Sequence, residues 1–222
     1  TSFSTRRRLL DRVRGLLLQE AEAMALLVAR EQGKPVAEAY LAEILPALDH
    51  LKHTAHHAEE ALAAQETEPA VFLVGHKRAR IEFRPIGPVL IITPWNYPFS
   101  IPITGLCAAL MAGNTVVLKP APSTTLIGLA IGDLFTRAGL PPGVLNVVAC
   151  SDAVAASLVS NPAFGKILFT GSVPTGRKIM ASASAQGTPV TLELGGKDPA
   201  VVCADADLER ASSGIVWAAF LN

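Results

Sequence analysis

The chain contains 222 residues, of which 50% are hydrophobic and 17% are charged; this composition excludes an intrinsically disordered protein and predicts a sizeable buried core. Lysine and arginine together number 19, as do aspartate and glutamate, so the formal net charge is zero and gives no electrostatic argument for binding nucleic acid or an anionic membrane. Three cysteines without paired spacing, Cys107, Cys150 and Cys203, indicate reduced and buried thiols in a cytoplasmic protein, not a disulfide framework or a zinc site.

Residues 1–68 predict a helical segment that packs on the rest of the chain. Leucine and alanine recur at helical spacing from residue 4 to about residue 32, where Gly33 and Pro35 end the pattern. A second helix is expected from Pro35 to about residue 65. The arginine-rich start is also typical of a mitochondrial presequence, but acidic residues within the same amphipathic pattern favour a solvated helix face.

Three histidines of the second predicted helix, His50, His53 and His57, lie at i, i+3 and i+7 on one face. This spacing could bind a metal, but the sequence has no HExxH motif and fixes no carboxylate beside the histidines. We therefore interpret them as part of a solvated face and predict no metal site.

Residues 69–84 change to the two-residue period of a strand and predict a β-hairpin, with residues 71–74 as the first arm and a turn at Gly75. A single hairpin is marginally stable by itself. We therefore expect it to pair with another chain, in a homo-oligomer, or with a further segment of the protein.

From residue 85 onward, short apolar strands alternate with helices. This order predicts an α/β fold with a Rossmann-like, mostly parallel sheet that has helices on both faces. The expected strands span 88–93, 114–119, 143–149, 166–170, 189–194 and 200–203, and the expected helices span 99–111, 124–138, 152–159, 175–185 and 208–220. Residues 85–118 carry no charge, but five prolines interrupt the first part of this run, so we interpret it as a buried strand, loop and helix and predict no membrane span.

Several residues suited to chemistry follow the predicted strands at their carboxyl ends, where ligands bind in such sheets. Asn96 follows the first strand, Lys119 ends the second, Gly171 and Ser172 follow the fourth, and Glu193 lies near the end of the fifth. We expect these residues to share one edge of the sheet.

Each of these residues has a functional interpretation and an ordinary one. The turn at Gly171 and Ser172 opens a helix, so its free N–H groups suit a pyrophosphate, although an ordinary strand-to-helix turn has the same sequence. Lys119 suits a ribose or phosphate but is also typical of a solvated lysine. Asn96 offers an amide to an oxyanion or simply forms a turn. Glu193 is either a general base or the partner of a lysine such as Lys197.

Five motifs together resemble the NAD(P)-dependent aldehyde dehydrogenase superfamily: PWNYPF, GNTVVLKPA, LPPGVLNVV, FTGSVPTG and LELGGKDPAVV. They occur in the order and at the spacing of that family. The resemblance extends over nearly the whole chain and implies that residues 85–222 form the NAD(P)-binding domain, that the hairpin serves oligomerisation, and that an aldehyde is the substrate.

The resemblance also implies roles for individual residues. Asn96 matches the asparagine of the oxyanion hole, and Glu193 matches the glutamate that activates the hydrolytic water. Lys119 matches the lysine at the adenosine ribose, and Gly171 and Ser172 match the turn beside the pyrophosphate. The other positions implied to bind NAD or NADP are Thr93, Trp95, Gly176 and Leu194.

The sequence departs from the family pattern at the nucleophile and at several positions near the coenzyme. The nucleophilic cysteine of the family belongs to a GQxC-like segment expected directly after the final WAAFLN, so we expect a cofactor-binding part that lacks the catalytic domain and is inactive alone. Pro122 replaces the glutamate that many NAD-preferring members use to bind the ribose, which removes one argument against NADP. Ser151 and Ala155 replace glycines near the cofactor, so the adenosine end is expected to sit differently.

Two other functions are compatible with this fold. An acyl-phosphate or acyl-CoA reductase would use the same architecture, but such relatives generally lack the hydrolytic glutamate, so Glu193 argues against them. A non-catalytic nucleotide-binding or assembly module would explain the absence of the nucleophile. Truncation of the chain explains that absence more simply.

Overall fold

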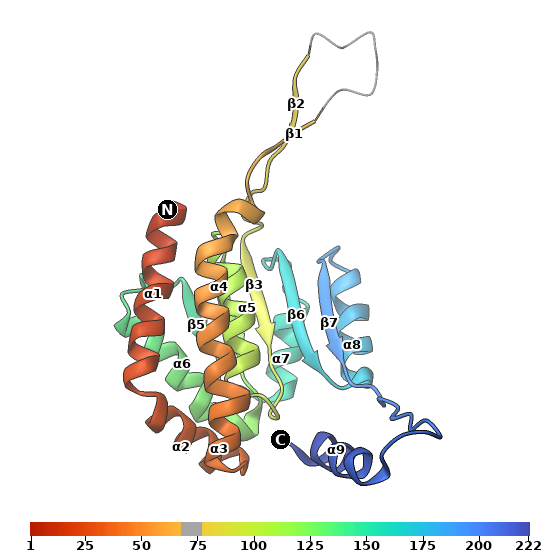
Figure 1. Cartoon of the computed structure of the whole chain (residues 1–222). Coiled ribbons are helices and arrows are strands. Elements are labelled where there is room, and N and C mark those ends of the chain that lie inside the picture. The colour runs from red at the N-terminus through yellow and green to blue at the C-terminus, as the bar shows by residue number, and fades with distance from the viewer. Residues whose placement is uncertain (68–76) are drawn as a thin grey trace.

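Five parallel strands form the centre of the protein in the order β5-β4-β3-β6-β7 (Figure 1). The structure is a computed structural model that describes residues 1–67 and 77–222. The strands are β3 (Pro88–Ile92), β4 (Thr115–Lys119), β5 (Leu145–Val147), β6 (Lys166–Gly171) and β7 (Val190–Leu194). The predicted α/β class and parallel sheet are therefore confirmed.

Helices cover both faces of the sheet because the central strands are apolar on both sides. On β3, Val89 and Ile91 pack with α5 (Ser100–Met111) and α6 (Thr125–Arg137). Leu90 and Ile92 of the same strand pack on the opposite side with α7 (Asp152–Val159) and α8 (Val173–Ser184). Alternate side chains of one strand thus belong to two separate hydrophobic cores.

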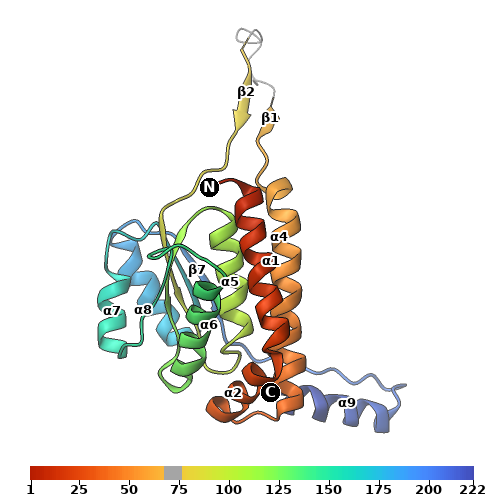
Figure 2. The same ribbon diagram turned by 90° about the vertical axis from the view of Figure 1, so that its left-hand side faces the viewer.

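The N-terminal helices form a further layer against α5 and α6 (Figure 2). The structure divides the first predicted helix at Glu20, whose backbone is not helical, into α1 (Phe3–Gln19) and α2 (Ala21–Gln32). The second comprises α3 (Val36–Ala39), a π-helical turn at Tyr40–Ile44 and α4 (Leu45–Ala61). Gly33 ends α2 with φ of 93°, the left-handed conformation that glycine adopts most readily.

The hairpin lies at one end of the molecule and projects away from it (Figure 1). Strand β1 (Gln65–Thr67) pairs antiparallel with β2 (Ala79–Ile81). The first arm therefore begins at Gln65, before the predicted boundary at residue 69, and the predicted arm at residues 71–74 lies outside the described residues. The residues of β1 are exposed, so the hairpin contributes little to the core.

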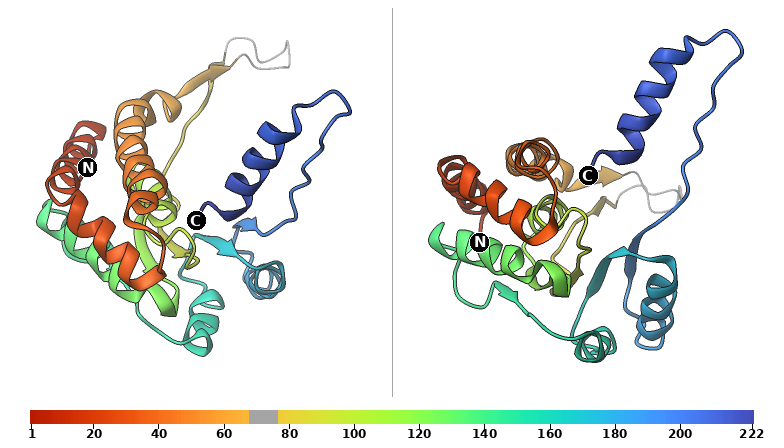
Figure 3. Two further views of the ribbon diagram at one scale, coloured as in Figure 1. Left: turned by 60° about the horizontal axis from the view of Figure 1, so that its bottom comes forward. Right: turned by 90° about the horizontal axis from the view of Figure 1, so that it is seen from below.

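The C-terminal part differs from the prediction at residues 200–203. This apolar run is not a strand, and Val201 is 84% exposed, because no neighbouring strand of the described chain lies beside it. Helix α9 (Leu208–Phe220) has its predicted bounds but lies apart from the sheet at the end of a long connection (Figure 3). Within the described residues, none of the helices has the length and apolar character that crossing a bilayer requires.

The order of the strands reverses between β3 and β6. The chain proceeds from β3 to β4 and β5 on one side and later returns to place β6 and β7 on the other. The segments that follow β3 and β6 consequently lead to helices on opposite faces of the sheet, α5 and α8. Such a reversal leaves a crevice at the carboxyl ends of the strands, which is the usual ligand site of this architecture.

Candidate functional site

A cleft of about 570 Å³ lies at this crevice, within the range of small-molecule and cofactor sites. Its walls come from the ends of β3, β4 and β6 and from one side of α7 and α8. The cleft brings together five of the predicted cofactor-binding residues, which are Thr93, Trp95, Lys119, Gly171 and Ser172.

Lys119 ends β4 inside the cleft and is only 4% exposed. Its Nζ donates a hydrogen bond of 3.1 Å to Oδ1 of Asp152, the first residue of α7. The interpretation of Lys119 as a solvated surface lysine is therefore wrong. A buried cation with one exposed carboxylate partner is well placed to bind the hydroxyl or phosphate oxygens of a ligand.

Thr93 directly follows β3 and is 4% exposed. Its backbone N–H donates to the carbonyl oxygen of Lys119 at 3.1 Å, which ties it to the next strand. Its hydroxyl, however, is buried and has no hydrogen-bond partner among the described residues. Since a buried hydroxyl without a partner is unfavourable, this group fits a site that a polar ligand completes.

The turn after β6 begins helix α8 at the wall of the cleft. Ser172 is the N-cap, and its Oγ accepts a hydrogen bond from the backbone N–H of Thr175 at 3.4 Å. A side chain at Gly171 would place its Cβ 2.6 Å from the ring of Phe169, so a larger residue would force this ring to move. The start of α8 supplies the positive end of a helix dipole, as an anion site requires.

Gly176 and Leu194 lie behind this turn and do not line the cleft. Gly176 is buried in α8, and a Cβ there would lie 2.5 Å from Cδ2 of Leu194 at the end of β7. The two residues therefore hold α8 against β7. They therefore support the turn at Gly171 and Ser172 from behind and do not contact the space inside the cleft.

Trp95 and Asn96 belong to the loop between β3 and α5. Trp95 is 59% exposed and lines the cleft. Asn96 is half-buried, and its backbone carbonyl accepts a hydrogen bond of 3.0 Å from Nζ of Lys34. The Asn96 side chain makes no hydrogen bond within the described part of the chain, so its amide is available to a ligand.

Lys34 and Glu43 form a buried ion pair beneath this loop that the sequence interpretation missed. Their Nζ and Oε1 atoms are 2.8 Å apart, and the side chains are 1% and 0% exposed. A signal for Glu43 was present: it is the one charged residue in the series Ala39, Glu43, Ala47, Leu51, whose other members are buried and apolar at four-residue spacing.

Glu193 lies near the carboxyl end of β7 and pairs with Thr170 of β6 across the sheet. Glu193 is exposed, because β7 is an edge strand of the five-stranded sheet and the end of β7 is open to solvent. Among the described residues, Glu193 forms no ion pair with Lys197 or with another base. Its carboxylate is therefore free to contact a ligand or water.

The cysteines differ in exposure. Cys107 is buried in α5, and burial raises the pKa of its thiol to about 12, which makes it a poor nucleophile at neutral pH. Cys150 is half-buried and Cys203 is exposed, so the prediction of three buried thiols holds for Cys107 alone. Cys203 is exposed because residues 200–203 do not join the sheet.

The three aligned histidines are exposed on α4, which agrees with a solvated helix face. The rings of His53 and His57 stack with their centroids 4.2 Å apart.

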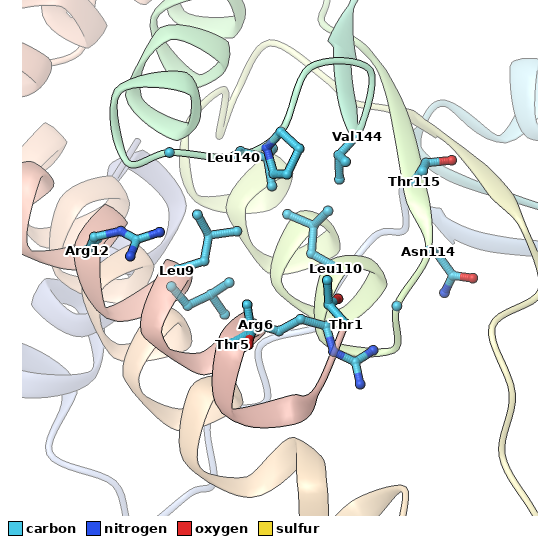
Figure 4. A pocket seen from close by; sticks show the side chains of 14 residues that line it. Thr1, Thr5, Arg6, Leu9, Arg12, Leu110, Asn114, Thr115, Leu140 and Val144 are labelled. Atoms are coloured by element: carbon cyan, nitrogen blue, oxygen red, sulfur yellow. The ribbon is translucent and has the colours of Figure 1, made fainter.

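A second, smaller cavity of about 200 Å³ lies at the opposite end of β4 (Figure 4). Arg6 and Leu9 of α1 face Asn114 and Leu140 across it. It is lined by none of the predicted site residues, whereas the larger cleft is lined by five of those predicted to bind the coenzyme; Asn96 and Glu193 line neither.

Comparison with known proteins agrees with this geometry. A family model described as the aldehyde dehydrogenase family matches residues 1–222. The chain belongs to the aldehyde dehydrogenase family.

Individual members of the family resemble this chain in sequence or in structure. A 4,4'-diapolycopene aldehyde oxidase of Methylomonas sp is 40% identical over 207 residues, which cover 93% of this chain and 39% of that protein. A succinate-semialdehyde dehydrogenase of Paenarthrobacter nicotinovorans is 36% identical over 224 residues, covering 100% of this chain and 49% of that protein. The solved NAD+ complex of an aldehyde dehydrogenase from Bacillus cereus is 32% identical, with a TM-score of 0.91 over 98% of this chain and 43% of that one. This aldehyde dehydrogenase chain therefore spans less than half the length of each of these proteins.

Proposed function

We propose that this chain forms the coenzyme-binding part of an enzyme that oxidises an aldehyde to a carboxylic acid with NAD+ or NADP+. One observation carries the proposal: the reversal of strand order brings Lys119 and the turn at Gly171 and Ser172, far apart in the sequence, to one cleft. The cleft offers a buried cation, a helix N-terminus and a buried hydroxyl that has no hydrogen-bond partner in the described parts of the chain, a set of groups that fits a dinucleotide.

Each wall of the cleft suits a different part of the coenzyme. Lys119 would hold the adenosine ribose, and the start of α8 at Ser172 would hold the pyrophosphate. Trp95 would flank the coenzyme, and the hydroxyl of Thr93 would gain a partner from it. When bound, the nicotinamide ring accepts hydride from the substrate.

We propose that the cleft can accept NADP+ as well as NAD+. Pro122 lines the cleft three residues after Lys119, so no carboxylate at this position repels a 2′-phosphate. Ala155 also lines the cleft, where its methyl group narrows the space beside α7 relative to glycine.

Asn96 and Glu193 would act on the substrate at successive stages. The Asn96 amide donates a hydrogen bond to the oxyanion that forms when a cysteine thiolate attacks the aldehyde carbon. After hydride transfer leaves a thioester, the Glu193 carboxylate accepts a proton from the water that attacks the acyl carbon and releases the acid. Because Cys107 is buried with a raised pKa, it does not supply the thiolate.

The hairpin supports the proposal of a homo-oligomer. The residues of β1 are exposed and those of β2 are mostly exposed, so the outer edges of this two-stranded sheet are available to a second copy of the chain. The exposed thiol of Cys203 favours a reducing compartment such as the cytoplasm.

The decisive experiment separates acylation from hydrolysis in the complete gene product. Glu193→Gln should retain a rapid burst of coenzyme reduction on mixing with an aldehyde, while steady-state acid release falls by about a hundredfold or more. The control is Glu22→Gln, which neutralises an exposed carboxylate on α2. Unchanged steady-state turnover would remove Glu193 from the hydrolytic step, and no aldehyde-dependent coenzyme reduction by the unsubstituted protein would overturn the function.

A further inference from the structure

The buried pair of Lys34 and Glu43 directs its remaining contacts to the loop that carries Asn96. The second carboxylate oxygen of Glu43 accepts hydrogen bonds from the backbone N–H groups of Phe99 at 3.1 Å and Ser100 at 2.8 Å. These groups are the N-cap and the first residue of α5, so the carboxylate caps that helix.

Lys34 contacts the other end of the same loop. Besides Glu43, its Nζ donates to the backbone carbonyl of Asn96 at 3.0 Å and lies 4.7 Å from the centre of the Tyr97 ring. The loop between β3 and α5 is therefore held on both sides of Tyr97, by a cation at one end and an anion at the other.

Stability alone does not explain such a pair. Removing two charges from water is costly, and apolar residues of similar volume commonly stabilise a fold equally well or better. An apolar pair, however, cannot make directional hydrogen bonds. Only a donor can hold the Asn96 carbonyl in place, and only an acceptor can hold the backbone N–H groups of Phe99 and Ser100.

We propose that Lys34 and Glu43 are positioning residues that set the Asn96 amide for its interaction with the oxyanion. This inference rests on the proposed function. The hydrogen bond to the Asn96 carbonyl fixes the main chain of the residue whose side chain must reach the reacting oxygen. An oxyanion donor displaced by about 1 Å loses a large part of its effect.

The test uses the complete gene product with the double substitution Lys34→Met and Glu43→Gln. This variant leaves no unpaired buried charge, and the glutamine oxygen still accepts from Phe99 and Ser100, so the protein should remain folded. Its thermal midpoint should fall modestly, because the N–H₂ group of the glutamine and the Asn96 carbonyl lose Lys34 as a partner. The Asn96 carbonyl loses its donor, and the burst rate of coenzyme reduction should fall tenfold to a hundredfold, on the order expected for a misplaced oxyanion donor, with the coenzyme Kd unchanged.

Two comparisons make the result specific. In an Asn96→Ala background, the double substitution should reduce the burst rate no further, because residues that act through one another are not additive. Lys52→Met, which removes an exposed lysine from α4, should change nothing. An unchanged burst rate in the double variant, or an equal loss in the Asn96→Ala background, would overturn the inference.

A structural measurement separates this inference from the proposed function. Hydrogen exchange of peptides spanning residues 93–100 should be faster in the double variant than in the unsubstituted protein or in Lys52→Met. Equal exchange would show that the pair does not hold the loop. If the unsubstituted protein reduces neither coenzyme with any aldehyde, the proposed function fails, and the exchange comparison still decides whether the pair orders the loop.

Discussion

Lys119 and Asp152 are 33 residues apart in the chain, yet Nζ of the lysine donates a hydrogen bond of 3.1 Å to Oδ1 of the aspartate at the candidate coenzyme cleft. The lysine side chain is 5% exposed and the aspartate side chain is 89% exposed. The ammonium group of Lys119 is thus buried, while the carboxylate of Asp152 remains open to solvent. A bound nucleotide would either replace the carboxylate as the partner of Lys119 or bind beside it.

Lys119→Met should weaken the binding of NAD+ and NADP+ about tenfold, or about 1.4 kcal/mol, because the apolar stem is retained while the charge is lost. Isothermal titration of the complete gene product measures both dissociation constants. Lys166→Met is the matched control, since Lys166 is half-buried at the opposite end of β6. Equal affinities for Lys119→Met and the unsubstituted protein would exclude Lys119 from the coenzyme site.

Pro122→Glu should shift the preference toward NAD+. The new carboxylate would line the cleft three residues after Lys119 and repel the 2′-phosphate of NADP+, lowering the ratio of kcat/KM for NADP+ over NAD+ by about tenfold or more. Pro122→Gln has a similar size without the charge and should leave the ratio nearly unchanged. If both variants shifted the ratio equally, the cause would be the shape of the side chain at residue 122 and not its charge.

Gly165→Ala should destabilise the chain by roughly 2 to 3 kcal/mol, because a Cβ would lie 2.1 Å from the backbone oxygen of Ile86 and must force the two segments apart. The same substitution at Gly15, in the interior of α1, should stabilise the chain by about 0.5 to 1 kcal/mol, because the new Cβ would have no atom of residues 1–67 or 77–222 within 4 Å outside its own helix turn. Urea unfolding measures the free energy of unfolding of both variants. If both substitutions changed this free energy in the same direction, the close contact between Gly165 and Ile86 would be contradicted.

Cys107 should resist alkylation in the folded protein at pH 9. Its pKa is raised to about 12, so only about one thiol in a thousand is ionised at that pH, and the side chain is also inaccessible. Iodoacetamide should modify the exposed Cys203 first, and peptide mass spectrometry identifies the modified residue. Denaturant should make Cys107 reactive. If iodoacetamide modified Cys107 and Cys203 at equal rates in the native protein, Cys107 would not be buried.

The sequence predicted the sheet well because its strands are short apolar runs between turn signals. It failed at residues 200–203, which are equally apolar, because a strand also needs a neighbour and this run has none in the described chain. The exposure of Glu193 could not be predicted for a related reason. Its exposure depends on β7 being the edge strand, a property of strand order that local sequence does not contain.

The sequence predicts which residues meet at the candidate site where the meeting depends on strand ends, and it misses contacts that depend on distant packing. Lys119 ends β4 and Ser172 directly follows β6, so a parallel sheet suffices to bring them to one edge. The contact between Lys34 and Asn96 joins residues 62 positions apart on different layers, and no local pattern reveals such a pairing.

That long separation also bears on synthesis. Glu43 and Lys34 leave the ribosome well before their partners, since Ser100 follows Glu43 by 57 residues. Until those partners emerge, both charges remain hydrated, and α4 lacks the surface of α5 against which it packs. The first four helices are therefore unable to complete their native packing as an autonomous early-folding unit, and nascent chains arrested before residue 100 should hold them in a loose, protease-sensitive state.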